Sequence, residues 1–269
     1  MRRKNHMAPA RIILIGFALL ILAGALLLTL PISTRDGQGA AFFDALFTAT
    51  SATCVTGLVV QDTALYWSGF GQAVILMLIQ IGGMGVVTAA AAISMLAGRR
   101  IGLKERWVMQ ESISAPQGGG IVRRTRFILA VTLVLEGTGS LLLALRFCPE
   151  MGLFRGLWYA VFQAVTPRTA GYNTLDLSQL SEPSRLLITL LMLVGGSPGS
   201  TAGGFKVTTL AVFVLAARAV FRRRADLQCF GRRLPTETLR SAAAVLMMYL
   251  GLFLLGGMAI CCVEDISLE

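Results

Sequence analysis

Two short runs of hydroxyl-bearing and small residues, each with a glycine near its end, lie between apolar segments of the chain. The first is Ser51 to Leu58, and the second, about 114 positions later, is Val165 to Tyr172. Irregular backbone at membrane depth is tolerated only where it is buried in protein or lines a wet cavity. A ring of backbone carbonyls that replaces the water shell of an ion is the best-known reason to build one. The alternative is an ordinary extracellular loop with Thr and Gly in a turn, and the recurrence of the run favours the ion site.

The candidate filter positions are the residues that lead to the two glycines. They are Thr53, Cys54, Val55, Thr56 and Gly57 in the first run, and Thr166, Pro167, Arg168, Thr169, Ala170 and Gly171 in the second. If carbonyls face an ion here, we expect Gly57 and Gly171 to hold positive φ or crowded backbone positions. Cations bound in this way need no side-chain ligand set.

Each run follows a short apolar segment, Phe42 to Thr50 and Phe154 to Ala164. Neither is long enough as a helix to cross about 30 Å of hydrocarbon. We therefore predict two re-entrant half-helices whose C-terminal ends, the negative ends of the helix dipoles, face the polar runs and favour a cation there. Asp44 either caps the first half-helix or attracts cations at a pore mouth.

A third polar segment interrupts the apolar stretch from Arg185 to Phe221 and cannot stay helical. Its residues, with the lysine that follows, are Gly195, Gly196, Ser197, Pro198, Gly199, Ser200, Thr201, Ala202, Gly203, Gly204 and Lys206. A phosphate-binding loop is excluded, because no strand precedes the segment and Val207, not Ser or Thr, follows the lysine. An unwound, glycine-rich break after a filter run fits a gate. Lys206 either helps to close the path to cations or only reaches toward the membrane surface.

Composition identifies an all-α integral membrane protein. The 269 residues are 55% hydrophobic and only 14% charged, and the mean hydropathy is +0.72. The net charge of +10 does not indicate nucleic acid binding, because the basic residues fall in three blocks between apolar segments. By the positive-inside rule these blocks are cytoplasmic. We expect the chain to lie in the cell membrane, surrounded by lipid, with five spans and two half-helices. The N-terminus is expected in the cytoplasm and the C-terminus outside.

The five expected spans are Ile12 to Leu30, Gly69 to Leu96, Phe127 to Leu145, Arg185 to Phe221 and Ser241 to Cys262. The second contains Gly82-Gly83-Met84-Gly85, whose small residues permit close helix packing. The third contains Glu136. An ionisable residue in a span is expensive and by default functional, but a structural hydrogen bond to a neighbouring helix explains Glu136 equally well.

Catalytic chemistry has little support in the sequence. Five cysteines without a C-x-x-C pair and one histidine, His6, provide no ligand set for a metal. No nucleophile and base stand out together, so we do not expect an enzyme or a bound cofactor. Cys148, expected outside, could pair with Cys261 or Cys262, and the sequence leaves this open.

The landmarks recur with a period of about 114 residues, in the order helix, half-helix, filter run, helix. We therefore expect a first pore unit at 1–97, a basic cytoplasmic linker at 98–126 and a second pore unit with the broken helix at 127–221. A second basic linker at 222–240 and the first helix of an incomplete third unit at 241–269 complete the chain. This unit is the layout of one potassium-channel subunit, which supplies a quarter of a carbonyl ring.

The runs Asp44 to Leu58, Phe162 to Asn173 and Gly195 to Lys206 closely resemble the membrane subunit of the TrkH/KtrB potassium-uptake systems, as does Gly102 to Arg106. The resemblance covers practically the whole chain. It implies uptake of K⁺, alone or coupled to Na⁺, through one pore built from four units. It also implies a homodimer docked on a ring of cytosolic nucleotide-binding regulatory subunits.

The chain departs from the family pattern in one respect. Its second filter run and broken helix look like the third unit of the family, whereas Phe127 to Leu145 and Pro149 to Trp158 look like the second. The pattern is that of a chain from which the interval between the second and third filters has been removed, and no fourth filter run is present, so we do not expect one such chain to assemble a complete pore. A shortened potassium transporter is the leading hypothesis. The alternative is a non-conducting membrane protein that binds the cytosolic regulator or a full-length partner.

Overall fold

The computed structural model describes residues 9–96, 121–177, 180–223, 228–229, 232–233 and 236–264. These residues are mostly helical, which agrees with the all-α membrane class. Of the two basic linkers expected at 98–126 and 222–240, residues 98–120, 224–227, 230–231 and 234–235 lie outside the described residues. The elements are α1 (Pro9–Leu28), η1 (Pro31–Ser33), α2 (Phe42–Cys54), α3 (Gly69–Met84), α4 (Val86–Leu96), α6 (Ile121–Met151), α7 (Leu153–Val165), α8 (Glu182–Leu193), α9 (Val207–Phe221), β1 (Gln228–Cys229), β2 (Arg232–Arg233) and α10 (Thr236–Glu264).

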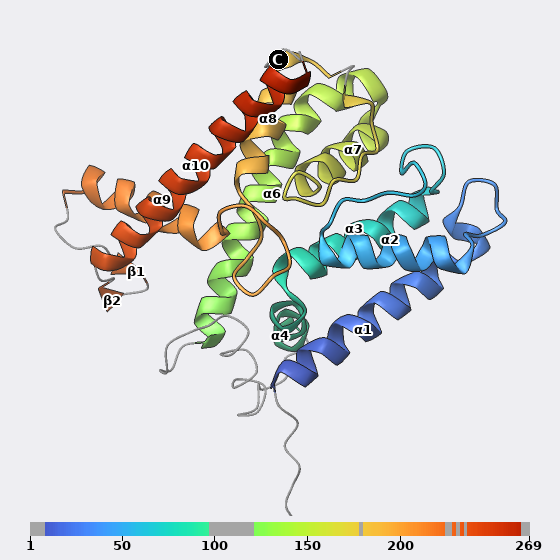
Figure 1. Cartoon of the computed structure of the whole chain (residues 1–269), viewed down its shortest axis with the longest axis horizontal. Helices are drawn as coiled ribbons and strands as arrows, with labels where there is room; N and C mark the ends of the chain where they lie inside the picture. The colour runs from blue at the N-terminus through green and yellow to red at the C-terminus, as the bar shows by residue number, and fades with distance from the viewer. Residues whose placement is uncertain are drawn as a thin grey trace, which may run out of the picture.

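The first unit is a compact group of α1, α2 and α3, shown in blue to teal in Figure 1. Small residues bring these helices close together. A Cβ at Gly24 of α1 would lie 2.7 Å from the Leu78 side chain of α3, and one at Gly82 would overlap the Thr53 carbonyl of α2. The buried cluster that results also contains Phe162 and Tyr172 of the second unit. One apolar core therefore joins the two units.

The expected span from Gly69 to Leu96 is not one straight helix. It bends by 101° between α3 and α4, at Gly85, which has a φ of 81°. A Cβ there would lie 2.6 Å from the carbonyl oxygen of Gly199. The bend follows from this contact with the second unit, because a straight helix would leave no room for the Gly199 backbone.

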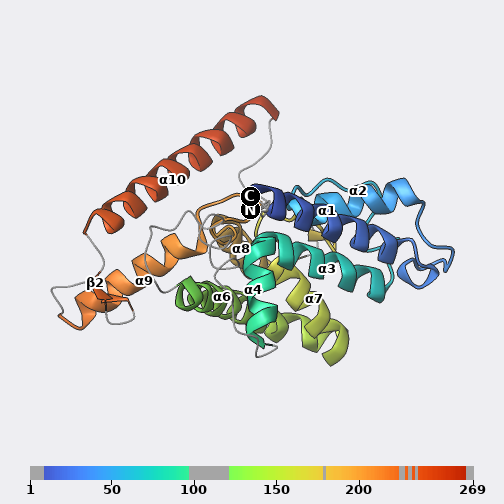
Figure 2. The ribbon, with the colours of Figure 1, turned by 90° about the horizontal axis from the view of Figure 1, so that it is seen from below.

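The second unit is built on α6 and α7, which pack along each other, with α8 above the glycine-rich break and α9 running off to the left of it (Figure 1). The last helix, α10, packs mainly against α9. Its Tyr249 also meets the ring of Phe205, just before α9, edge-on with the ring centroids 6.0 Å apart. Figure 2 shows α10 standing apart from α1, α2, α3, α6 and α7. Most of its large apolar side chains are exposed.

Three described helices, α1, α6 and α10, are long and apolar enough to cross a membrane, and α3 with α4 makes a fourth if the bent pair counts as one span. The fourth expected span, Arg185 to Phe221, consists of α8 and α9, with 12 and 15 residues. At 1.5 Å per residue neither reaches across about 30 Å of hydrocarbon alone. By contrast, α2 and α7 have 13 residues each, as expected for half-helices.

Candidate ion filter and gate

The first filter run begins later than its sequence suggests. Helix α2 continues through Thr53 and Cys54, so these two candidate residues lie in its last helical turn. The helix ends at Val55, which has a left-handed φ of 55°, and the Thr56 N–H donates to the Ser51 carbonyl at 2.9 Å. Such a left-handed cap satisfies the last carbonyls of a helix. Gly57 follows with a φ of 85°, as predicted.

The second filter run repeats this backbone. Helix α7 ends at Val165, and the positive φ angles fall on Thr169 (71°) and Gly171 (74°). The two positive-φ positions of each loop are thus separated by one residue, and they match between the loops at the repeat period. Pro167, Arg168 and Ala170 lie in the turn that directly follows α7.

Each loop is closed by a hydroxyl group that bonds to the carbonyl after the glycine. Ser51 Oγ donates to the Leu58 carbonyl at 2.7 Å, and Thr166 Oγ1 donates to the Tyr172 carbonyl at 2.6 Å. Thr166 Oγ1 also accepts from the Tyr172 N–H at 3.0 Å. These bonds fix the curvature of both loops without using the carbonyls in between.

The two loops meet at their glycines. A Cβ on Gly171 would lie only 2.7 Å from the Cα of Gly57, and a Cβ on Gly57 would lie 3.2 Å from the Ala170 carbonyl oxygen. The buried Tyr172 hydroxyl donates to the Thr48 carbonyl of α2 at 3.1 Å, which ties the loops together. Because the two backbones touch, an ion does not fit between Gly57 and Gly171, and a path lined by both must run beside them.

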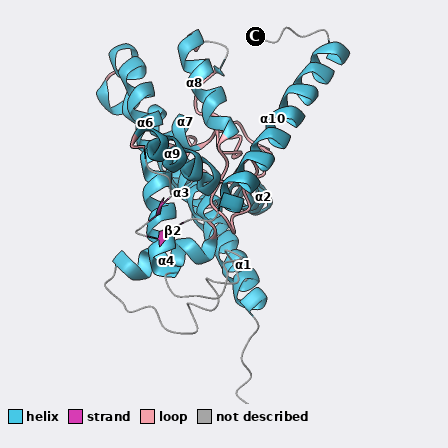
Figure 3. Ribbon diagram, turned by 90° about the vertical axis from the view of Figure 1, so that its left-hand side faces the viewer, coloured by secondary structure: helices cyan, strands magenta, loops and turns pink. Residues whose placement is uncertain are grey.

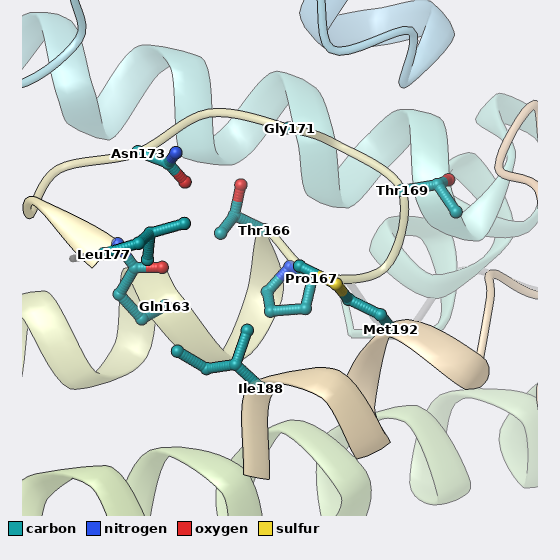
Figure 4. A pocket seen from close by; sticks show the side chains of 9 residues that line it. All are labelled: Gln163, Thr166, Pro167, Thr169, Gly171, Asn173, Leu177, Ile188 and Met192. Atoms are coloured by element: carbon teal, nitrogen blue, oxygen red, sulfur yellow. The ribbon is translucent and has the colours of Figure 1, made fainter. Parts of the chain in front are cut away.

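A cavity of about 260 Å³ lies beside the second loop (Figure 4). Its wall includes Gln163 of α7, Thr166, Asn173 and, from α8, Ile188 and Met192. Gln163 is fully buried, and neither atom of its amide has a hydrogen-bond partner. The cavity therefore has an apolar wall with a few convergent polar groups beside the candidate filter.

Arg168 does not face water, although it belongs to the filter run. It is 3% exposed and pairs with Glu136 of α6, which is 6% exposed. Gln80 of α3 bridges the pair: its Nε2 donates to Glu136 at 2.6 Å and its Oε1 accepts from Arg168 at 3.1 Å. The structure therefore gives Glu136 an ionic partner in the filter run, which neither interpretation of the sequence had specified.

The glycine-rich break from Gly195 to Gly204 is non-helical, as expected. It is hydrogen-bonded to the first unit. Ser197 donates through its Oγ to the Met84 carbonyl at 2.8 Å and through its N–H to the Gly83 carbonyl at 3.0 Å. Thr201 Oγ1 donates to the Thr53 carbonyl at 3.2 Å. The break thus lies against the C-terminal ends of both α2 and α3, and the first filter loop follows α2.

The break also contacts the second filter loop, because the Gly203 N–H donates to Thr169 Oγ1 at 3.0 Å. Lys206 turns back toward the break and donates to the Ala202 carbonyl at 2.6 Å. Its ammonium group is therefore held at the break. The same loop contains the remaining residues of the segment, whose two ends lie in backbone contact at Gly195 and Gly204. These residues are Gly195, Gly196, Pro198, Gly199, Ser200 and Gly204.

Two other side chains differ from the simplest expectation. Asp44 lies in the first turn of α2 but makes no capping bond; instead it accepts from Gln61 Nε2 at 3.2 Å. Cys148, Cys261 and Cys262 are free thiols, so the pairing left open by the sequence is absent among them.

Comparison with known proteins agrees with this arrangement. Residues 156–269 match the family model of the TrkH cation transport protein. The Ktr system potassium uptake protein B of Bacillus subtilis is 30% identical, in an alignment that covers 92% of this chain and 80% of that protein. The chain belongs to the TrkH/KtrB family of cation transport proteins.

Another relative, the potassium/sodium uptake protein NtpJ of Enterococcus hirae, is 27% identical over 98% of this chain and 82% of its own length. A search of solved structures finds the potassium transporter TrkH of Vibrio parahaemolyticus, with 18% identity, a TM-score of 0.46, and coverage of 97% of this chain and 74% of that one. The alignments with the first two relatives run over 356 and 368 residues, more than the 269 present here. Part of each relative therefore has no counterpart in this TrkH/KtrB chain.

Sequence reasoning missed two features of the site. One is Gln80, although a polar amide inside an apolar helix was a signal available from the sequence. The other is the positive φ of Val55 and Thr169. Neither residue type suggests it, because β-branched side chains seldom adopt a left-handed backbone.

Proposed function

We propose that this TrkH/KtrB chain is the membrane-embedded pore subunit of a potassium-uptake system. The observation that carries the proposal is the pair of matching loops with positive-φ glycines, each placed at the C-terminal end of a short helix. Helix C-terminal dipoles and unpaired carbonyls favour a cation. The relatives named as potassium or potassium/sodium uptake proteins support K⁺ as the transported ion, with Na⁺ as a co-ion. On this proposal the chain is a transporter and not an enzyme.

We assign selection to the filter residues around Gly57 and Gly171 and closure to the break from Gly195 to Lys206. The break contacts both filter loops and the ends of α2 and α3, so a change in its shape alters the path directly below the filter. A homodimer in the cell membrane, docked on a cytosolic nucleotide-binding regulatory subunit, completes the proposal. The naming of the B. subtilis relative as part of a Ktr system supports such an assembly.

One observation favours a second candidate function. The contact between Gly57 and Gly171 leaves no opening for an ion between the two loops, and the described chain supplies only two of them. A non-conducting membrane protein that binds the cytosolic regulator or a full-length partner would have this structure.

Potassium uptake by a deficient cell separates the two functions. The chain is expressed in a bacterial strain without its own K⁺ uptake, alone and together with a cytosolic regulatory subunit, and growth at low K⁺ and Rb⁺ uptake are measured. We expect growth and saturable Rb⁺ uptake from the chain. A Gly171→Ala variant should insert into the membrane to the same level but should take up less Rb⁺. Normal insertion without any uptake would establish the non-conducting alternative.

A further inference from the structure

A buried ion pair lies in the second filter loop and has no counterpart in the first. Arg168 comes from the loop, Glu136 from α6 and Gln80 from α3, so three separate elements meet at one point. The repeat places Cys54 at the position of Arg168. Helix α1, which corresponds to α6, carries no ionisable residue from Ile12 to its last residue. Neither Glu136 nor Arg168 therefore has an ionisable counterpart at the corresponding place in the first unit.

The pairing is asymmetric in its hydrogen bonds. The amide nitrogen and the amide oxygen of Gln80 each make a hydrogen bond, and both carboxylate oxygens of Glu136 accept one. Arg168 uses only one terminal nitrogen, and its Nε and NH1 are buried without a hydrogen-bond partner. A guanidinium that served only as an anchor would engage several of its five donors. Here the carboxylate is fully satisfied while the cation is only partly so.

An unneutralised charge at this place would act on any ion in the filter. Arg168 stands one residue before Thr169 and three before Gly171, within the loop that we propose to line the path. Charges in a medium of low effective dielectric interact over several ångströms with little screening. A bare guanidinium would therefore repel K⁺, and the ionised Glu136 removes that repulsion.

We propose that Glu136 is a positioning and charge-compensating residue of the ion site: it holds Arg168 in the second filter loop and sets the affinity of the filter for the cation. Gln80 fixes the orientation of the pair. This inference rests on the proposed function, because it assumes that a cation occupies the loop.

The test uses the sign of the charge that each substitution leaves. Glu136→Gln leaves a net positive charge, Arg168→Gln leaves a net negative charge, and the double variant leaves none. We expect Glu136→Gln to raise the K⁺ concentration for half-maximal uptake by roughly tenfold, Arg168→Gln to lower it, and the double variant to return toward wild type. A merely structural pair predicts losses of the same direction in both single variants.

Glu150→Gln is the matched control. It makes the same substitution on the same helix in the exposed pair with Arg146, and it should leave the half-maximal concentration unchanged. If Glu136→Gln alone fails to fold, the comparison of Arg168→Gln with the double variant still isolates the charge of Glu136.

A second measurement separates this proposal from the proposed function. The K⁺ dependence of thermal unfolding is recorded for the purified full chain and its variants, with Na⁺ and choline as comparison ions. We expect K⁺ to stabilise the wild type and the double variant, and Glu136→Gln only at higher K⁺. Absence of uptake with this pattern intact would refute transport but support the ion-site role of Glu136. The proposal for Glu136 would be overturned if both single variants shifted the K⁺ dependence of the unfolding temperature equally. It would also be overturned if K⁺ stabilised none of the proteins.

Discussion

At the scale of single residues, Gly57 and Gly171 carry the tightest constraint in the two filter loops. Both have positive φ, and each lies against the backbone of the other loop. We expect Gly171→Ala to cost about 1–3 kcal/mol of local backbone strain and to widen the contact between the loops. The measured result should be weaker discrimination of K⁺ against Na⁺ in uptake competition, with normal membrane insertion. Gly57→Ser, in a context with all four units, should have the same effect.

Gly137→Ala is the control for this pair. Gly137 lies in α6, and a Cβ there would meet no atom within 4 Å, so the substitution should leave selectivity unchanged. Unaltered discrimination in Gly171→Ala would instead assign the loop to an ordinary external turn.

The same residues show how far sequence reasoning reaches at this scale. Glycine signals positive φ on its own, so Gly57 and Gly171 were predictable. Val55 and Thr169 share the left-handed backbone because the helix caps and loop closures of Ser51 and Thr166 impose it. Hydrogen bonds within each loop accompany this backbone, and the residue types at Val55 and Thr169 did not indicate it.

At the scale of elements, the broken segment between α8 and α9 acts on α3 through Ser197. Its Oγ donates to the Met84 and Gly83 carbonyls at the end of α3. We expect Ser197→Ala to destabilise the closed break by about 1 kcal/mol and to give higher, less regulated K⁺ uptake. Deletion of Ser197 to Ala202, in a context with all four units, should have a larger effect in the same direction, because it also removes the Thr201 bond to α2.

Ser200→Ala is the matched control, since the buried Ser200 hydroxyl has no hydrogen-bond partner. It should leave uptake and its regulation unchanged. If Ser197→Ala and the deletion also left both unaltered, the break would be a packing feature and closure would occur elsewhere.

The bounds of α7 were close to those predicted, whereas α2 continues past the predicted end at Thr50 to Cys54. The geometry between elements was not predicted. The sequence Gly82-Gly83-Met84-Gly85 indicated an interruption, but the 101° bend depends on the Gly199 backbone that occupies the inside of the corner. A contact between two repeats cannot be obtained from either repeat alone.

At the scale of the whole molecule, the two ends of the described chain lie on opposite sides. Figure 3 shows the N-terminal end of α1 at the bottom and the C-terminal end of α10 at the top. Such an arrangement requires an odd number of crossings. α1, α6 and α10 provide three, and α3 with α4 and α8 with α9 each provide one only if the two halves cross together. The basic blocks place the end near α1 inside.

A pair of reporter fusions tests this topology. We expect an enzyme that is active only outside the membrane to be active when fused after Glu269 and inactive when inserted after Gly119, in the basic segment predicted to be cytoplasmic. A fluorescent reporter that matures only in the cytoplasm should give the reverse pattern. Cytoplasmic activity after Glu269 would show an even number of crossings. The glycine breaks would then let one of the two bent helix pairs turn back within the membrane, and the expected five-span topology would be wrong.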